Sequence, residues 1–456
     1  MIYNSIYNMF RKSPWALRKL MYLIPINYRL GGKNFSETYS LLKNSEFWDK
    51  EKIRKYQETE LEKVLEHAVN HVPYYKDIKL SSSNPFKNLE KFPIIEKEII
   101  QENIEKFISD NISRKNAYYV STGGTSGNQM NFYLDNSTYG REWAFVMTAW
   151  RRIGFKPGDK VVSFRGVEFK DAEKGIYWQD NPIYNMLEMS PFHMSDENLP
   201  KYLEIINEFK PKYIHGYPSA ITILSNYMEK NNIDFPDIKG VLAVSENIYP
   251  WQREIIENSL KTRLFSFYGQ SERVIMASEC EHNTKYHVFP EYGVTEILDE
   301  KDNFVNVGEM GELIGTSFLN YYMPFIRYRT GDYAVLSKES CECGREHLIM
   351  DKLLGRWTQD MIVAKDGSHI STTALNLHSS ALNNVNNFQF FQKEKGELIL
   401  RINPKNSYGI DDEKKIKEAF YKKIGNNLDI EIQIVDEISL TERGKYRLLI
   451  QKLELD

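Results

Sequence analysis

Apolar residues in the first quarter of the chain recur with helical spacing. The clearest run carries its apolar side chains on one helical face: Leu61, Val64, Leu65, Ala68 and Val72. Pro73 follows directly and ends the run. The same spacing holds, less regularly, from Phe35 to about Asn111, and we therefore predict a helical N-terminal section.

After this section the pattern becomes an alternation of helices and strands. A buried helix is predicted at 139–153 and further helices at 220–230 and 250–260, with strands at 160–164, 212–215, 241–244 and 263–267. Such alternation is typical of a parallel sheet covered on both faces, with ligands at the carboxyl ends of the strands. Between Tyr286 and Leu336 the strands shorten, at 294–298, 311–316 and 333–336, which predicts a β-rich subdomain.

The last hundred residues have a compact α+β pattern. Strands are predicted at 387–392, 397–402 and 430–435, with a helix from Asp411 that carries Ile416, Phe420 and Ile424 on one face. About 100 residues is enough for a small independent domain. The predicted fold class is thus α/β: mixed and parallel sheets covered by helices, a β-rich subdomain, and a small hinged α+β domain. The predicted limits are an N-terminal domain of 1–354 (helical section 1–111, core 112–354), a hinge at 355–360 and a mobile C-terminal domain at 361–456.

Composition narrows the class of protein. The 456 residues are 41% hydrophobic and carry a net charge of -4. The chain therefore lacks the excess of basic residues that is typical of nucleic-acid-binding proteins. Three cysteines cannot form a disulfide framework, which predicts a reducing, cytoplasmic location. No apolar run approaches the roughly 18 residues that span a bilayer. Residues 1–30 mix basic and apolar side chains, and this arm either packs on its own protein or makes peripheral membrane contact.

One short run is denser in hydrogen-bond donors than the rest of the chain. It reads Ser121, Thr122, Gly123, Gly124, Thr125, Ser126, Gly127, between two predicted strands at 117–120 and 130–134. Glycines let the backbone approach an anion, and the N–H and hydroxyl groups replace the water of a polyphosphate. No lysine follows the last glycine, which argues against a P-loop NTPase and requires a cation from elsewhere. The alternative interpretation is a flexible surface hairpin.

Polar residues also follow two strands of the predicted parallel sheet. Ser245, Glu246 and Asn247 come after 241–244, and the segment from Tyr268 and Gly269 to Glu272 follows 263–267. Both segments lie at carboxyl ends, where a nucleotide site is expected.

Together, five segments resemble the AMP-forming adenylating superfamily, which includes acyl-CoA synthetases, luciferases and peptide-synthetase adenylation domains. They are Ser121 to Gly127, Tyr268 to Glu272, Tyr328-Arg329-Thr330-Gly331-Asp332, Gly355-Arg356 and Gly444-Lys445. Further cues resemble its phenylacetate-CoA ligase-like branch, particularly members associated with capsular polysaccharide biosynthesis: Val72-Pro73-Tyr74-Tyr75, Phe92-Pro93-Ile94, His215-Gly216-Tyr217-Pro218-Ser219 and Cys341-x-Cys343-Gly344-Arg345.

The resemblance implies a role for each segment. The Ser121 to Gly127 run would hold the β- and γ-phosphates of ATP, Glu272 would bind Mg²⁺, and Asp332 would hold the ribose. Ser245, Glu246 and Asn247 would line the adenine, with Tyr268 and Gly269 in the same nucleotide site. Arg356 would contact ribose or phosphate, and Lys445 would reach the carboxylate and α-phosphate. Many family members place a carboxylate two or three residues after the hinge arginine, whereas this chain reads Arg356-Trp357-Thr358-Gln359-Asp360, so the pivot residue stays open.

The implied activity is ATP-dependent formation of an acyl-adenylate from a small carboxylic acid, followed by transfer of the acyl group to the thiol of coenzyme A. Two alternatives remain: transfer to an amine in surface polysaccharide biosynthesis, and a non-catalytic nucleotide-binding scaffold. Trp150, His215, Tyr217 and Phe267 are candidates for the acid pocket, although aromatic residues are more often plain core. The sequence identifies neither the acid nor the oligomeric state.

The three cysteines suggest a metal site. Cys280 is followed by His282 and His287, and Cys341 and Cys343 lie further along the chain. Three thiolates and one imidazole form a usual closed tetrahedral zinc site, and the family resemblance favours structural Zn²⁺ here. His287 is the preferred fourth ligand because it lies in a predicted strand, and His282 is the alternative. The competing interpretation is three reduced, partly buried thiols.

Overall fold

A long mixed β-sheet organises the computed structural model, which describes residues 23–122, 129–167, 169, 171–354, 361–375, 377, 380–438 and 448–453. Within these residues the sheet has twelve strands in the order β11-β12-β13-β14-β10-β9-β8-β7-β6-β3-β5-β4. Its two halves differ in strand direction, and the join between β8 and β9 carries part of the candidate site.

One half is parallel, as the sequence predicts. Its strands are β3 (Val161–Phe164), β5 (Met186–Met189), β6 (Tyr213–Gly216), β7 (Gly240–Ala243) and β8 (Leu264–Gly269), with β4 (Trp178–Asn181) antiparallel at the edge. Strands β3, β5, β6 and β7 are buried at every position, as expected for strands covered on both faces.

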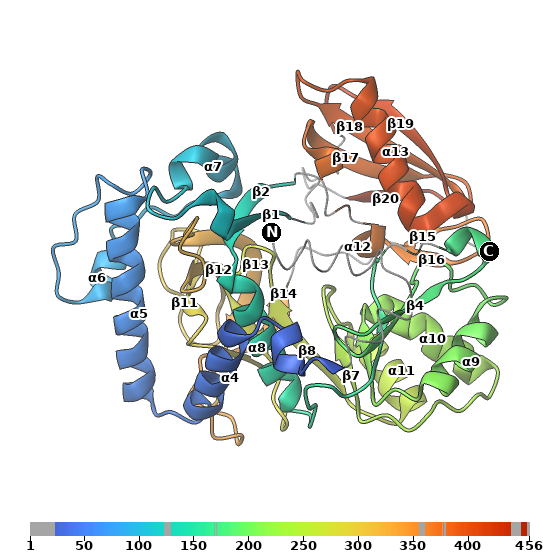
Figure 1. Ribbon diagram of the computed structural model, residues 1–456, viewed down its shortest axis with the longest axis horizontal. Helices are drawn as coiled ribbons and strands as arrows, with labels where there is room; N and C mark the ends of the chain where they lie inside the picture. Colours follow the sequence, from blue (N-terminus) through green and yellow to red (C-terminus); the bar gives the residue numbers. More distant parts are fainter. Residues whose placement is uncertain are drawn as a thin grey trace.

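Helices cover both faces of the parallel half (Figure 1). They are α8 (Ser137–Arg151), α9 (Leu199–Phe209), α10 (Pro218–Lys230) and α11 (Pro250–Leu260). Helices α9, α10 and α11 share one apolar cluster with the strands, and α8 shares another with residues from the opposite side. Each of α9, α10 and α11 has a proline in its first turn, where the missing N–H costs no hydrogen bond.

The other half of the sheet is antiparallel and corresponds to the predicted β-rich subdomain. It contains β9 (Met276–Ser278), β10 (Tyr286–Val288), β11 (Gly293–Leu298), β12 (Met310–Ser317), β13 (Tyr328–Leu336) and β14 (Ile349–Leu354). Strand β14 lies between β13 and β10, so the chain returns to the middle of the sheet after leaving it. This return brings the segment before β14 next to the end of β9.

The N-terminal section is helical, as predicted, and flanks the antiparallel half. Its helices are α3 (Ile26–Arg29), α4 (Lys33–Ser45), α5 (Lys50–His71), α6 (Pro85–Leu89) and α7 (Lys97–Glu102). Helix α5 begins at Asp49, whose carboxylate accepts a hydrogen bond from the Lys52 backbone N–H (2.8 Å). The hairpin of β1 (Ala117–Ser121) and β2 (Asn131–Asp135) follows.

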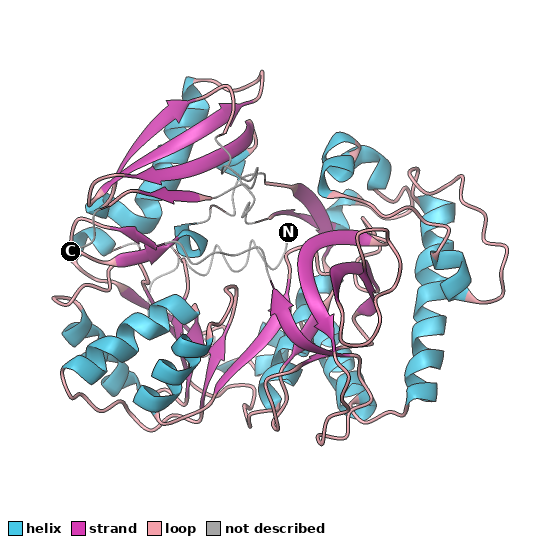
Figure 2. Cartoon of the chain, turned by 180° about the vertical axis from the view of Figure 1, so that it is seen from behind, coloured by secondary structure: helices cyan, strands magenta, loops and turns pink. Residues whose placement is uncertain are grey.

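The C-terminal section has the predicted α+β pattern (Figure 2). It contains β15 (Met361–Val363), β16 (His369–Ser371), α12 (Thr372–Leu375), β17 (Val385–Gln392), β18 (Glu397–Pro404), α13 (Ile410–Ile424), β19 (Asp429–Ile434) and β20 (Leu449–Gln451). A four-stranded sheet in the order β19-β18-β17-β20 packs against α13, which buries Ile416, Phe420 and Ile424 as the pattern indicated. The predicted hinge at 355–360 lies outside the described residues, and the domain limits remain predictions.

Three elements of the parallel half were not predicted from the sequence: β4, β5 and α9. Across the described part of the chain, no helix combines the length and hydropathy needed to cross a membrane.

Candidate active site

Glu272 lies in the turn between β8 and β9, where the two halves of the sheet meet. The residue is 9% exposed, and its carboxylate accepts a hydrogen bond from the Tyr328 hydroxyl at the start of β13 (2.9 Å). The Tyr328 side chain is itself buried. A neutral donor orients this carboxylate without cancelling its charge, which suits a group that binds a cation.

Asp332 lies four residues further along β13 and has a similar arrangement. Its carboxylate accepts a hydrogen bond from the Tyr268 hydroxyl (2.9 Å), and that hydroxyl accepts one from the Gln270 side-chain amide (3.0 Å). Burial, together with the negative charge of Asp332, raises the pKa of Tyr268 well above its ordinary value, so the hydroxyl remains a donor. Through these contacts Glu272, Tyr268 and Asp332 lie near one another, and their roles in binding nucleotide and metal stay predictions.

The base of the glycine and hydroxyl run is held by the β1–β2 hairpin. The Thr122 backbone N–H donates to the Met130 carbonyl (2.8 Å), and the Thr122 hydroxyl accepts from the Met130 N–H (2.9 Å). Ser121 and Thr122 are both buried. The predicted phosphate-binding residues Gly123, Gly124, Thr125, Ser126 and Gly127 lie outside the described residues, as do Arg356 and Lys445.

Two features fix the segment after β7: the backbone conformation of Ser245 and the hydrogen bonds of Glu246 to the first turn of α10. Ser245 has φ of 67°, in the left-handed region that few residues other than glycine adopt. The Glu246 carboxylate accepts hydrogen bonds from the Ser219 N–H (3.0 Å) and hydroxyl (2.9 Å), at the start of α10. This contact fixes the carboxyl ends of β6 and β7 relative to each other. The adenine role of Ser245, Glu246 and Asn247 stays a prediction.

The four residues suggested for the acid pocket do not form one group. His215 contacts Trp150, with ring centroids 5.0 Å apart, and its Nδ1 lies 2.8 Å from the Leu242 carbonyl oxygen. Burial lowers the pKa of His215 to about 3, so its ring is neutral. Trp150 and Phe267 belong to the cluster beneath α8, whereas Tyr217 belongs to the cluster on the opposite face of the sheet. The sequence could not separate these faces, because it gives no direction for a side chain at the end of a strand.

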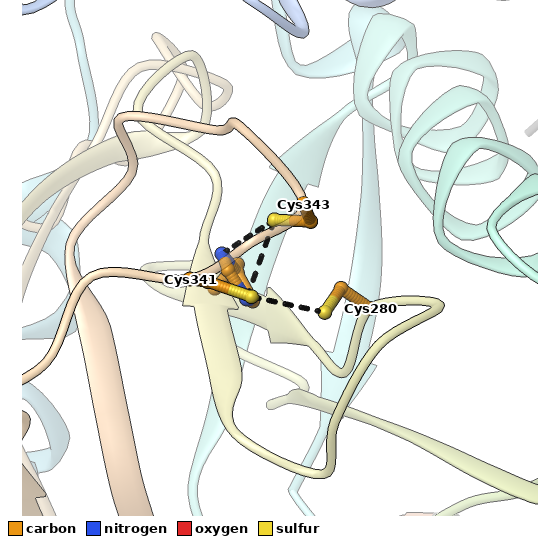
Figure 3. A group of neighbouring side chains, drawn as sticks. Cys280, Cys341 and Cys343 are labelled. Atoms are coloured by element: carbon orange, nitrogen blue, oxygen red, sulfur yellow. Dashed lines mark hydrogen bonds between the residues drawn. The ribbon is translucent and has the colours of Figure 1, made fainter.

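The three cysteines gather into a second group (Figure 3), to which His287 also belongs. Sγ atoms of Cys280, Cys341 and Cys343 and a ring nitrogen of His287 all lie within 4.8 Å of one another. Cys280 follows β9, His287 lies on β10, and Cys341 and Cys343 precede β14. The Cys280 and Cys341 sulfurs are 3.5 Å apart, and Nε2 of His287 is 3.9 Å from the Cys343 sulfur. The ring of His287, rather than that of His282, thus completes the group.

Arginines surround this cysteine group. Arg345 donates to both oxygens of Glu281 (2.8 and 3.1 Å) and to Glu46 (2.7 Å), and its side chain is 3% exposed. Burial raises the pKa of Cys343, but hydrogen bonds from Arg345 outweigh it and lower the pKa overall. Burial, reinforced by Arg152 and Arg345, lowers the pKa of His287 to about 3, so its ring is neutral, as a metal ligand must be. Three sulfurs, one neutral imidazole and nearby positive charge fit a closed zinc site.

Several residues of both groups were missed by sequence reasoning. Tyr328 belongs to a segment that was singled out, but its contact with Glu272 joins residues 56 positions apart. Arg152 is 126 positions from Ser278, to whose hydroxyl it donates (2.7 Å). Contacts of this range leave no local signal, so the donors could be found only from the structure.

Comparison with known proteins identifies relatives over most of the chain. The family model for the CapK C-terminal domain matches residues 362–452. Protein CapK of Staphylococcus aureus is 26% identical over 379 residues, covering 80% of this chain and 81% of CapK. The phenylacetate-coenzyme A ligase of Thermus thermophilus is 23% identical over 406 residues, covering 83% of this chain and 85% of the ligase.

Solved structures share the fold. A 2-hydroxyisobutyryl-CoA ligase, crystallised with an acyl-AMP and CoA in its thioesterification state, superposes with a TM-score of 0.57 over 90% of this chain and 92% of the ligase, at 18% identity. The chain is thus a homologue of CapK and the phenylacetate-CoA ligases, and it shares the fold of a 2-hydroxyisobutyryl-CoA ligase.

Proposed function

We propose that this chain is an AMP-forming ligase that activates a carboxylic acid with ATP and transfers the acyl group to the thiol of coenzyme A. The observation that carries the proposal is the pair of carboxylates Glu272 and Asp332, each oriented by a tyrosine hydroxyl at the carboxyl edge of the sheet. The phenylacetate-CoA ligase relative and the structure bound to an acyl-AMP and CoA support the same reaction class.

The first half-reaction needs no protein nucleophile. A carboxylate oxygen of the acid attacks the α-phosphorus of ATP, the bond to the β-phosphate oxygen breaks, and pyrophosphate leaves. The protein must hold two anions in line and offset their charge. Glu272 would hold Mg²⁺, which offsets phosphate charge when bound, and Tyr328 keeps that carboxylate in place. Lys445 would supply the second positive charge, as the family resemblance implies.

The nucleotide sugar would be held by Asp332. A carboxylate can accept hydrogen bonds from two neighbouring ribose hydroxyls, and the Tyr268 hydroxyl donates to this carboxylate (2.9 Å). Gln270 in turn fixes the Tyr268 hydroxyl, so Asp332 is oriented before the nucleotide arrives. The second half-reaction would form a thioester between the acyl group and CoA and release AMP.

The proposal is tested by pyrophosphate exchange into ATP with a panel of aliphatic and aromatic carboxylic acids. Exchange that depends on an added acid, with thioester formed only when CoA is present, would support it. An acyl-adenylate that reacts with added amines but not with CoA would replace CoA by an amine acceptor, as an association with polysaccharide biosynthesis would favour. If the protein binds ATP without exchange for any acid, it is a scaffold rather than a ligase.

We also propose that Cys280, His287, Cys341 and Cys343 bind one structural Zn²⁺ ion. The ligands come from three separate parts of the antiparallel half, so the ion would tie β9, β10 and the segment before β14 together. Metal analysis of protein purified without chelators should find about one zinc per chain, and Cys343→Ser should lower that content. Protein that contains no zinc but melts normally would contradict the proposal.

A further inference from the structure

The C-terminal section contacts the rest of the chain at two separate places. On one side it meets the β1–β2 hairpin: the Asn383 side-chain oxygen accepts from the Asn131 amide (2.9 Å) and the Tyr119 hydroxyl (3.4 Å). On the other side it meets the segment between β3 and α9. There the Asn427 amide donates to the Phe192 carbonyl (3.1 Å), and the Tyr421 hydroxyl donates to Glu173 (2.5 Å).

Gln129 belongs to both the hairpin and this contact. Its side-chain amide nitrogen donates to the Thr122 carbonyl (2.9 Å) and also to the Leu377 carbonyl in the C-terminal section. Both partners are carbonyl oxygens, so the nitrogen, with its two hydrogens, must face them. Gln129 is 6% exposed, so its amide is shielded from water. If either hydrogen bond were lost, one amide N–H of Gln129 and the carbonyl it had bonded would be left unsatisfied. One amide group thus holds the base of the glycine and hydroxyl run and the docked C-terminal section together.

The other side of the contact depends on close backbone approach. A Cβ atom added at Gly166, just after β3, would lie 2.6 Å from the carbonyl oxygen of Ala374 in α12. Gly166 does not have a positive φ, so alanine is compatible with its backbone conformation. The conflict therefore arises only from the backbone of the C-terminal section, which would have to move.

From these contacts we propose that Gln129 is a positioning residue that couples nucleotide binding to docking of the C-terminal section. This rests on the proposed function, because Thr122 is part of the run expected to hold the ATP phosphates. With the section docked, Gln129 satisfies the Thr122 and Leu377 carbonyls at once and holds the base of the run in the form that binds ATP. Docking therefore strengthens ATP binding, and by linkage ATP strengthens docking.

The test uses full-length protein and two substitutions that act on opposite sides of the contact. Gly166→Ala disfavours docking sterically and leaves Gln129 in place. Gln129→Met keeps the side-chain volume and removes the shared donor. Gly409→Ala is the matched control, because it adds the same methyl group to the C-terminal section where no atom lies within 4 Å. Docking is measured by amide hydrogen exchange in residues 361–384, and ATP affinity by calorimetry in magnesium buffer.

We expect Gly166→Ala to speed exchange in residues 361–384 and to weaken ATP binding by about fivefold or more. Gln129→Met should weaken ATP binding to a similar extent, whereas Gly409→Ala should change neither measurement. In the double variant, Gly166→Ala should still speed exchange but should no longer weaken ATP binding, because the shared donor is already gone.

Two results would overturn the coupling: faster exchange in Gly166→Ala with unchanged ATP affinity, or losses of affinity that multiply in the double variant. Unchanged exchange in Gly166→Ala would reject the docking contact itself. If wild-type protein does not bind ATP, the proposed function fails and the coupling with it, while the exchange measurements still decide whether the section docks at Gly166.

Discussion

Glu272 and Glu46 are both nearly buried carboxylates, but their partners differ. Glu272 accepts a hydrogen bond from the neutral Tyr328, whereas Glu46 is paired with Arg151 and Arg345. Among the described residues, no cation forms a salt bridge with Glu272. The carboxylate of Glu272 is thus oriented by a neutral hydroxyl, whereas the charge of Glu46 holds α4 near the cysteine group. The two carboxylates are alike in burial, and the charge of the partner is what differs between them.

Of the substitutions that test the comparison between Glu272 and Glu46, Glu272→Gln should have the largest effect, and that effect should be on catalysis. Glutamine keeps the shape and can still accept a hydrogen bond from Tyr328, so the change removes little but the charge. We expect kcat for acid-dependent pyrophosphate exchange to fall by about 10³, because the charge that holds Mg²⁺ against the phosphates is lost. The measurement is exchange at saturating ATP and acid.

Glu46→Gln is the control for this experiment. It neutralises an equally buried carboxylate but should leave kcat within about twofold for the folded fraction, since the residue acts only on stability. A loss of activity as large as that of Glu272→Gln would remove the distinction between the two carboxylates.

Arg345→Met should give the next largest effect, on stability. It removes the guanidinium that donates to both Glu46 and Glu281, while Glu46 keeps its ion pair with Arg151 and Glu281 is partly exposed. We expect the free energy of unfolding in urea to fall by about 2 kcal/mol, because hydrogen bonds to two charged groups are lost, with kcat of the folded protein little changed. Destabilisation below about 1 kcal/mol would mean that this network behaves as an exposed salt bridge.

Tyr328→Phe should have a smaller effect, which is confined to metal use. It removes one hydrogen bond to Glu272, worth about 1.5 kcal/mol for a charged acceptor. The Mg²⁺ concentration for half-maximal exchange should therefore rise about tenfold, with kcat at saturating Mg²⁺ nearly preserved. A fall in kcat that excess Mg²⁺ does not restore would mean that Tyr328 acts on the reaction itself.

The smallest effect concerns pH. Burial and the charge of Asp332 raise the pKa of Tyr268 well above its ordinary value of about 10, so its hydroxyl stays protonated at all pH values below that. Any loss of activity between pH 8 and about 10 must then come from another group. Tyr268→Phe should keep the wild-type alkaline limb of the pH–rate profile, and a clear shift of that limb would show that Tyr268 titrates there.

The predicted elements agree with the structure where one segment carries the whole signal. Helix α11 spans the predicted residues, and α8, β6 and β7 differ from their predictions by one or two residues at each end. Helix α9 could also have been predicted, since Leu199, Tyr202, Leu203 and Ile206 have helical spacing. Strand β4 could not, because its polar residues Gln179 and Asn181 are satisfied by Glu188 on the neighbouring strand. A polar strand of this kind looks like a loop until its partner is known.

In the candidate sites too, the features that could be predicted are those whose signal lies within one segment or in residue types that are rare in the chain. The cysteine group was predictable because its residue types are rare in the chain and suit one metal. The positions of Glu272 and Asp332 were predictable from their segments, but the tyrosines that orient them were not. The acid-pocket role of Trp150, His215, Tyr217 and Phe267 stays a prediction, and Tyr217 and His215 lie on opposite faces of the sheet although they are two residues apart.

The apolar side chains of α9, α10 and the large sheet form one cluster with those of β15, β16 and α12. Separating the C-terminal section from the sheet would expose this hydrocarbon surface to water and raise the heat capacity. The free energy of docking is therefore curved with temperature, and it weakens on cooling as well as on heating. Cooling alone would therefore favour separation of the C-terminal section from the large sheet, without any change in bound ligand.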